Sequence, residues 1–148
     1  MGNINYKYES FKKALESLEK AIINYEEILK RHESLSFMEH IEIVESMRDS
    51  MIQRFEFYVD LFWKYIKKYL EEVLKTTSQI NAPAAVIRVA CNSNLITPKD
   101  SELALNMFKS RNLTSHIYRE EIADQISKDI PEYYKMMSKY LDILMPKN

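Results

Sequence analysis

Apolar residues recur along the chain at spacings of three and four positions, which is the period of one face of an α-helix. The first such stripe predicts a helix over residues 5–31. Charged residues of both signs occupy its other positions, a pattern typical of a solvated surface rather than of a binding site. The apolar positions of this helix are Phe11, Leu15, Leu18, Ile22, Tyr25 and Leu29.

The longest apolar stripe begins after Ser36, which lies three positions before Glu39. This is the spacing of a capping box, in which two side chains satisfy backbone N–H groups at a helix start. Neither Gly nor Pro interrupts the pattern before about residue 76, so the sequence predicts one long central helix. Its stripe comprises Val44, Met47, Met51, Phe55, Tyr58, Phe62, Ile66, Tyr69 and Val73.

Within this helix, residues 55–69 (FEFYVDLFWKYIKKY) carry apolar side chains on nearly every face. Two interpretations are open: an aromatic platform on which nucleic-acid bases stack, or a central helix packed by its own domain and by a second subunit. Burial on more than one side is the commoner reason for such a helix. We therefore expect a homodimer, because the apolar perimeter exceeds what a single small bundle would cover.

The second half of the chain predicts three more helices. A short one has Asn81 near its N-terminal cap and Pro83 in its first turn, and the next begins with Thr97 as its cap. The last starts with a run of acidic residues, which the helix dipole favours at an N-terminus. Pro131 is expected to kink or divide this last helix.

Composition supports an all-helical fold. The whole chain contains one Gly and four Pro, which leaves few sites for hairpins or glycine-rich phosphate loops and argues against Rossmann and P-loop folds. We expect a single all-α domain over residues 1–148. Its architecture should be an antiparallel helical bundle of about five helices around the long central one.

Cysteine, histidine and charge counts limit the chemistry. Cys91 is the only cysteine, so it forms neither an internal disulfide nor a thiolate metal cage, and a cytoplasmic location is expected. His32 and His40 have no partner at metal-ligand spacing, so we expect no metal and no cofactor. Lys and Arg number 21 against 22 Asp and Glu, so the protein has no net positive charge that would attract RNA over its whole surface. Any RNA contact must therefore be local. No stretch reaches the roughly 20 apolar residues of a membrane span.

Residues 107–121 (MFKSRNLTSHIYREE) depart from the pattern of apolar stripe and charged face. Hydrogen-bonding side chains crowd into eight positions there: Arg111, Asn112, Thr114, Ser115, His116 and Tyr118. The amide and hydroxyl groups of Asn112, Thr114 and Ser115 can orient a phosphate. Arg111 can neutralise charge on phosphorus, and the imidazole of His116 can act as acid or base near neutral pH. Such a set suits metal-free phosphodiester chemistry.

Two considerations limit this interpretation. In an unbroken helix, side chains five positions apart diverge by about 140°. The helix must therefore end between Arg111 and His116, or a second chain must complete the site. The spacing also arises often by chance, and Thr or Ser beside a helix end is ordinary capping.

Three segments together resemble the HEPN superfamily, specifically its small nucleotidyltransferase substrate-binding proteins. They are residues 107–121, residues 52–72 and the segment APAAVIRVACNSNLI. An R-N-x-x-x-H core, the H-x-Y that overlaps its end and the aromatic helix occur together and in family order. The resemblance implies a helical bundle that pairs as a homodimer. It also implies a separate minimal nucleotidyltransferase as partner, in a complex or as a toxin and antitoxin.

The resemblance assigns roles to individual residues. In HEPN ribonucleases the Arg and His of the motif cleave RNA without a metal, and these positions match Arg111 and His116. Asn112 matches the polar residue after the Arg, and Tyr118 matches a Tyr that a partner enzyme adenylylates in some toxins. Arg119 departs from the acidic or small capping residue expected there, and it either adds positive charge to the site or pairs with a Glu.

Two functions of different classes follow. In the first, the protein is a metal-independent ribonuclease toxin of a toxin–antitoxin pair. In the second, it is a non-catalytic subunit that binds a nucleotide or RNA and presents substrate to its partner enzyme, or accepts modification by it. The intact Arg and His favour the first function, although the same pair could bind phosphate without cleaving it.

Overall fold

The computed structural model describes residues 2–31, 36–75 and 80–146, and helices are the only regular secondary structure in these ranges. The elements are α1 (Gly2–Lys30), α2 (Phe37–Glu72), α3 (Pro83–Asn92), α4 (Pro98–Asn112), the short 3₁₀ turn η1 (Thr114–His116) and α5 (Glu120–Ile143). The prediction of an all-α bundle of about five helices around one long helix is confirmed.

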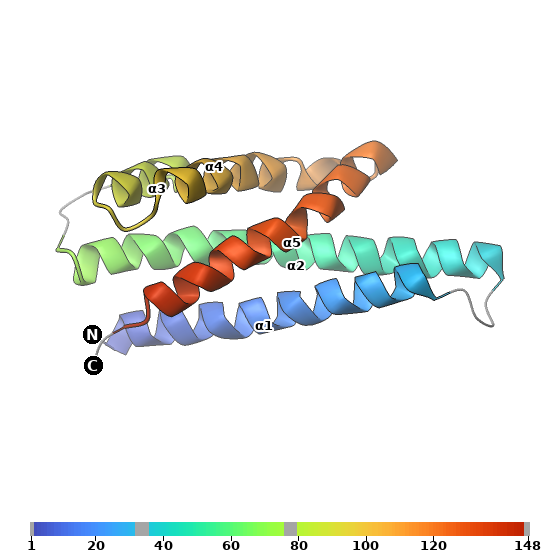
Figure 1. Ribbon diagram of the computed structural model, residues 1–148, viewed down its shortest axis with the longest axis horizontal. Coiled ribbons are helices and arrows are strands. Elements are labelled where there is room, and N and C mark those ends of the chain that lie inside the picture. The colour runs from blue at the N-terminus through green and yellow to red at the C-terminus, as the bar shows by residue number, and fades with distance from the viewer. Residues whose placement is uncertain (1, 32–35, 76–79, 147–148) are drawn as a thin grey trace.

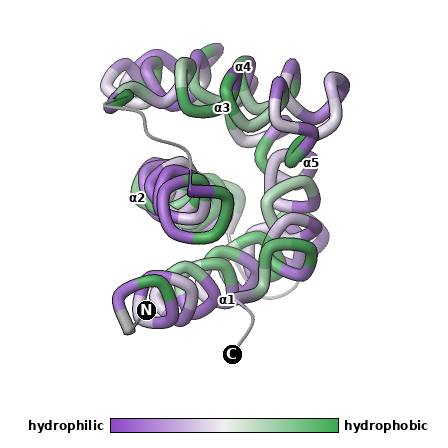
Figure 2. Tube along the Cα trace, turned by 90° about the vertical axis from the view of Figure 1, so that its left-hand side faces the viewer, coloured by the Kyte–Doolittle hydropathy of each residue, from purple (hydrophilic) through white to green (hydrophobic). Residues whose placement is uncertain are grey.

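The helices are arranged in three layers with α2 in the middle. Figure 1 shows α1 antiparallel to α2 on one side, and α3 and α4 together on the other side, over the C-terminal half of α2. Figure 2 shows α5 passing along one flank of these layers, from the level of α4 to that of α1. No helix of the described ranges covers the opposite flank of α2.

Two helix starts confirm the predicted caps. At the start of α2, the Glu39 N–H donates to Ser36 Oγ at 3.2 Å and the Ser36 N–H donates to Glu39 Oε2 at 3.1 Å, which is a complete capping box. At the start of α4, Thr97 Oγ1 accepts from the Asp100 N–H at 3.1 Å. Local sequence signals therefore fix where both helices begin.

Other helix ends differ in detail from the prediction. α1 begins at Gly2, slightly earlier than expected, and α3 has Ala82 at its N-cap position, one residue after Asn81. α2 ends at Glu72 rather than near residue 76, which lies outside the described residues. Helix ends fray and vary by a residue or two, so these shifts leave the order of elements unchanged.

Pro131 does not divide α5, so the prediction of a division there is wrong. The helix continues through it from Glu120 to Ile143. A proline removes one backbone hydrogen bond, but Ile130 and Tyr133 on either side are buried in the core and hold the segment helical. None of the helices described by the structure is long and apolar enough to span a membrane.

Three positions of the predicted apolar stripes are exposed. Leu29 is 45% exposed, Met47 36% and Val73 44%, whereas Ile28 and Arg48, beside the first two, are buried. Figure 1 shows α5 diverging from α1 toward η1, so the end of α1 packs against α2 and not against α5. Near the end of α1, the buried face of the helix therefore differs from the face that is buried in the middle of α1.

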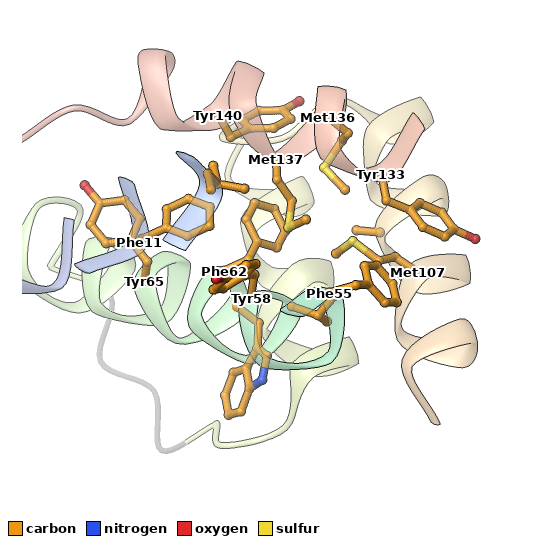
Figure 3. Packing of buried hydrophobic residues seen from close by; sticks show 14 of the residues in the cluster. Phe11, Phe55, Tyr58, Phe62, Tyr65, Met107, Tyr133, Met136, Met137 and Tyr140 are labelled. Atoms are coloured by element: carbon orange, nitrogen blue, oxygen red, sulfur yellow. The ribbon is translucent and has the colours of Figure 1, made fainter. Parts of the chain in front are cut away.

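The aromatic stretch of α2 is covered largely by the protein's own helices. Figure 3 shows side chains of α1, α4 and α5 around it, with the rings of Phe11 and Phe62 5.7 Å apart and those of Phe55 and Tyr133 stacked at 5.8 Å. Only Phe57 of its aromatic residues stays strongly exposed, at 61%. The apolar-perimeter argument for a second subunit is therefore wrong, and the homodimer stays a prediction that rests on the family resemblance.

Candidate substrate site

The polar motif lies where α4 ends and α5 begins. α4 ends at Asn112, and the hydroxyl of Thr114, which is 5% exposed, donates to the Arg111 carbonyl at 2.8 Å. The helix therefore ends between Arg111 and His116, which is one of the two alternatives that the divergence of their side chains left open. Thr114 satisfies a carbonyl of the last helical turn, so its hydroxyl is engaged with backbone and not with the surface.

Arg111 is held by two carboxylates of α2. Its Nε and Nη2 donate to the two oxygens of Asp60 at 3.3 and 3.2 Å, and its Nη1 lies 3.2 Å from Glu56 Oε1. The Arg111 side chain is 28% exposed and each carboxylate 40%. A bidentate pair of this kind fixes the plane of the guanidinium. Two negative groups surround one positive group, so the charge of Arg111 is more than balanced.

An open pocket of about 530 Å³ lies beside Arg111, between α2, α3 and α4. Its polar side chains are Asp60, Lys64, Arg111 and Asn112, and its largest apolar ones are Trp63 and Phe108. Both aromatic side chains are 8% exposed, so they are rigid parts of the wall. This size and this mixture of apolar wall with a few polar groups are typical of small-molecule sites. We call it the motif pocket.

Ser115, His116 and Tyr118 lie outside the motif pocket, on the exposed turn that leads into α5. His116 Nδ1 is 3.4 Å from the Tyr118 hydroxyl, and the two rings meet edge to face with centroids 6.0 Å apart. Tyr118 is 76% exposed. The structure thus brings Arg111 and Asn112 to one pocket, buries Thr114, and leaves Ser115, His116 and Tyr118 on neighbouring surface.

Residues 6–145 match the family described as nucleotidyltransferase substrate binding protein like. The chain belongs to this family. Its usual fold is that of the HEPN superfamily, so the resemblance inferred from the motif segments is confirmed. The family match extends over all the helices that form the motif pocket.

A solved structure is similar to this chain over most of its length. It is a crystal structure of a protein from Thermus thermophilus, with 32% sequence identity and a TM-score of 0.65. The match covers 87% of this chain and 99% of that chain. No curated protein matches the chain.

Arg48 is a buried charged residue that no sequence pattern indicated. It is 4% exposed, and its Nη1 donates to Glu120 at 2.8 Å and to Asp124 at 3.4 Å, while its Nε donates to Asp49 at 3.1 Å. The hydrogen bond from Arg48 lowers the pKa of the Glu120 carboxyl and raises the pKa of the guanidinium itself. Arg48 therefore ties the start of α5, and the turn before it, to α2.

Arg119 occupies the N-cap position of α5. Of the two roles open to it, the structure shows the pairing, because its Nη2 lies 2.9 Å from Glu121 Oε1. The pKa of the Glu121 carboxyl is lowered, first by a hydrogen bond from the backbone N–H of Glu121 and second by the hydrogen bond from Arg119. The Arg119 charge is thus directed along α5 and not into the motif pocket.

Metal-ligating side chains do not cluster in the part of the chain that the structure describes. Among those residues, no three His, Cys, Asp or Glu side chains come together as ligands for a metal ion. His32, one of the three histidines of the chain, lies outside them. The carboxylates of Glu56 and Asp60, on α2, are engaged with Arg111.

Proposed function

We propose that this protein is the substrate-binding subunit of a two-component nucleotidyltransferase, in which a separate minimal enzyme carries the catalytic groups. The observation that carries the proposal is the motif pocket beside Arg111 and Asn112. Its apolar wall gives a small molecule a surface to bury, and its polar groups orient that molecule. The name of the family to which the chain belongs is in keeping with this role.

The charges around the motif pocket limit the substrate. Glu56 and Asp60 together balance the charges of Arg111 and Lys64, so a bare phosphate gains little there. Asp60 accepts hydrogen bonds, Arg111 donates them, and Asn112 does both. A substrate with hydroxyl or amino groups as well as acceptors satisfies all three, and its apolar part lies against Trp63. We therefore favour a polar acceptor molecule over the nucleotide or RNA phosphate expected from the motif.

Nucleotidyl transfer by the partner enzyme tests the proposal. The purified enzyme is incubated with radiolabelled ATP, Mg²⁺ and the small-molecule fraction of a cell extract as the source of acceptor, with and without this protein. A substrate-binding subunit raises the local concentration of acceptor at the enzyme. We expect labelled small-molecule product to form much faster when this protein is present. Equal rates in the two reactions would contradict the proposal.

A ribonuclease role is the second candidate, and the exposed His116 is the observation in its favour. His116 would assist attack of a ribose 2′-hydroxyl on the adjacent phosphate, and Arg111 would stabilise the charge that develops. Within one chain, however, Arg111 is bound to Asp60 and Glu56 beside the motif pocket, which His116 does not line. A second chain would have to complete such a site.

We expect the purified protein to leave RNA intact, because no single chain presents His116 together with an uncompensated Arg111. Incubation with single-stranded and structured RNA, followed by electrophoresis, measures this. The ribonuclease role would be favoured instead if RNA is cut, the cutting disappears in His116→Ala, and it persists in the control Arg119→Ala. Circular dichroism of both variants verifies that the helices are retained.

Tyr118 is the residue that we propose for modification by the partner enzyme. Its phenol is 76% exposed, so its oxygen can reach the α-phosphorus of ATP and form a phosphodiester with AMP while diphosphate leaves. With the cognate nucleotidyltransferase, ATP and Mg²⁺, we expect the intact mass to rise by AMP. The gain should vanish in Tyr118→Phe and persist in Tyr6→Phe, whose ring is 73% exposed. A gain that survives in Tyr118→Phe would place the modification elsewhere.

A further inference from the structure

A second hollow lies between α1 and α2. Its volume is about 560 Å³, comparable with that of the motif pocket. The residues relevant to binding are Tyr6, Lys7 and Lys13 from α1 and Phe57, Tyr58 and Lys64 from α2. We call this hollow the lysine groove.

The lysine groove has a positive charge that its own residues do not balance. Lys7, Lys13 and Lys64 line it, and no Asp or Glu does. Within the part of the chain that the structure describes, none of these three ammonium groups is ion-paired with a carboxylate. In the motif pocket, by contrast, two carboxylates hold Arg111. A ligand with several negative charges therefore gains more in the lysine groove.

Two aromatic rings of the lysine groove are exposed to solvent. Tyr6 is 73% and Phe57 61% exposed, whereas Tyr58 and Tyr65 beneath them are buried. Phe57 is the strongly exposed exception in an aromatic stretch that otherwise packs inside the protein. Exposed aromatic faces beside cationic side chains suit a flat ring that carries phosphates, because the ring stacks while the phosphates meet the ammonium groups.

The positive surface continues beyond the lysine groove. An adjoining hollow of about 320 Å³ is lined by Lys7 and Lys64 again, together with Lys67, Lys68 and one carboxylate, Glu71. Lys67 donates to Asn81 at 3.1 Å, and Lys68 is paired with a neighbouring glutamate of α2 at 2.8 Å. A phosphate chain that starts at the aromatic rings thus meets the ammonium groups of Lys7 and Lys64, whereas those of Lys67 and Lys68 already have polar partners.

We propose that the lysine groove binds a nucleoside triphosphate, with the base against Phe57 and Tyr6 and the phosphates along Lys7, Lys13 and Lys64. The base of a nucleoside triphosphate is flat and suits the exposed aromatic rings of the groove. Its phosphates carry up to four negative charges and suit the lysines. This site is distinct from the motif pocket, and the inference does not rest on the function proposed for that pocket. Lys64 lines both hollows, so ligands in the two sites would lie side by side.

Calorimetric titration of the purified protein with ATP, and separately with inorganic triphosphate, tests the proposal. We expect ATP to bind, and Lys13→Ala to weaken its binding about fivefold or more at low salt. Phe57→Ala should weaken ATP binding about tenfold and leave the weaker binding of inorganic triphosphate unchanged. Both side chains are exposed, so neither change removes core packing. Lys20→Ala on another part of α1 and Phe37→Ala at the exposed start of α2 are the matched controls.

Three outcomes would overturn the proposal. The first is no ATP binding by the wild-type protein at low salt. The second is ATP binding that survives Lys13→Ala and Phe57→Ala but is lost in Arg111→Ala, which would place the nucleotide in the motif pocket. The third is a change from dimer to monomer in Phe57→Ala, measured by light scattering, with ATP binding unaffected. That result would make the groove a contact between two copies of the chain.

Discussion

Replacing Arg111 by Ala is expected to reduce nucleotidyl transfer to the acceptor by about 100-fold in kcat/KM, with the fold retained. Arg111 supplies donors to the motif pocket and holds the plane of Asp60 through two hydrogen bonds. Hydrogen bonds to charged groups contribute about 1.5–3 kcal/mol each. Without Arg111, the Asp60 and Glu56 carboxylates are left unneutralised beside the substrate. The rate of labelled product formation by the partner enzyme, measured against acceptor concentration, gives the change.

Arg119→Ala is the matched control for this variant. Arg119 is also an arginine paired with a carboxylate, but it is 57% exposed, pairs with Glu121 and does not line the motif pocket. Its loss should leave kcat/KM within about twofold, since exposed ion pairs contribute little. If Arg111→Ala and Arg119→Ala behave alike, the motif pocket is not the substrate site.

Replacing Arg48 by Ala is expected to lower the free energy of unfolding by about 2 kcal/mol. Arg48 is 4% exposed, so both its packed stem and its hydrogen bonds to Glu120 and Asp124 are lost. These carboxylates are 59% and 57% exposed, and water can solvate them once Arg48 is gone. The cost is therefore below that of stranding a buried charge. Urea unfolding followed by circular dichroism measures it.

A comparable change at Arg54 serves as the control for Arg48. Arg54 is exposed on the same helix, and its Nη1 donates to Ser50. Arg54→Ala should alter the free energy of unfolding by less than about 0.5 kcal/mol. Equal losses in the two variants would show that Arg48 contributes no more than a surface arginine.

The contribution of Arg48 depends on pH. The pKa of Glu120 lies below its ordinary value of about 4.3 because Arg48 donates to its carboxylate. Stability from this pair is thus fully present above that ordinary value and is lost as the pH falls through the lower folded pKa. The difference in unfolding free energy between wild type and Arg48→Ala should be constant down to about pH 5 and shrink below about pH 4. If wild type and Arg48→Ala differ by the same unfolding free energy above about pH 5 and below about pH 4, the pair of Arg48 with Glu120 is not the source of this stability.

The helices and their starts could be predicted because the signals are local. Ser36 and Glu39 are three residues apart, and so are Thr97 and Asp100, and each pair makes its cap within one turn. The end of α4 before His116 was one of the two alternatives that helix geometry left open, the other being a site completed by a second chain. Such features depend on neighbours in sequence, which a sequence displays directly.

The surroundings of the motif could not be predicted in the same way. Arg111 was expected to meet a phosphate, but it is bound by Glu56 and Asp60, which lie on α2 and reach it only after α4 packs on that helix. Arg48 was overlooked because a charged residue is usually exposed, and its partners at the start of α5 are distant in sequence. Long-range pairing of charges leaves no periodic signal along the chain.

Occupancy of the motif pocket can be measured directly through Trp63, because it is the only tryptophan of the chain and lines that pocket. Its indole N–H gives a single cross-peak in a nitrogen–proton correlation spectrum, which can be followed while an acceptor of the partner enzyme is added. We predict that the peak shifts and saturates over the acceptor concentrations that saturate transfer, and that it stays fixed in Arg111→Ala. An unmoved Trp63 peak at acceptor concentrations that support this protein's stimulation of transfer would contradict the account, because the substrate would then lie outside the motif pocket.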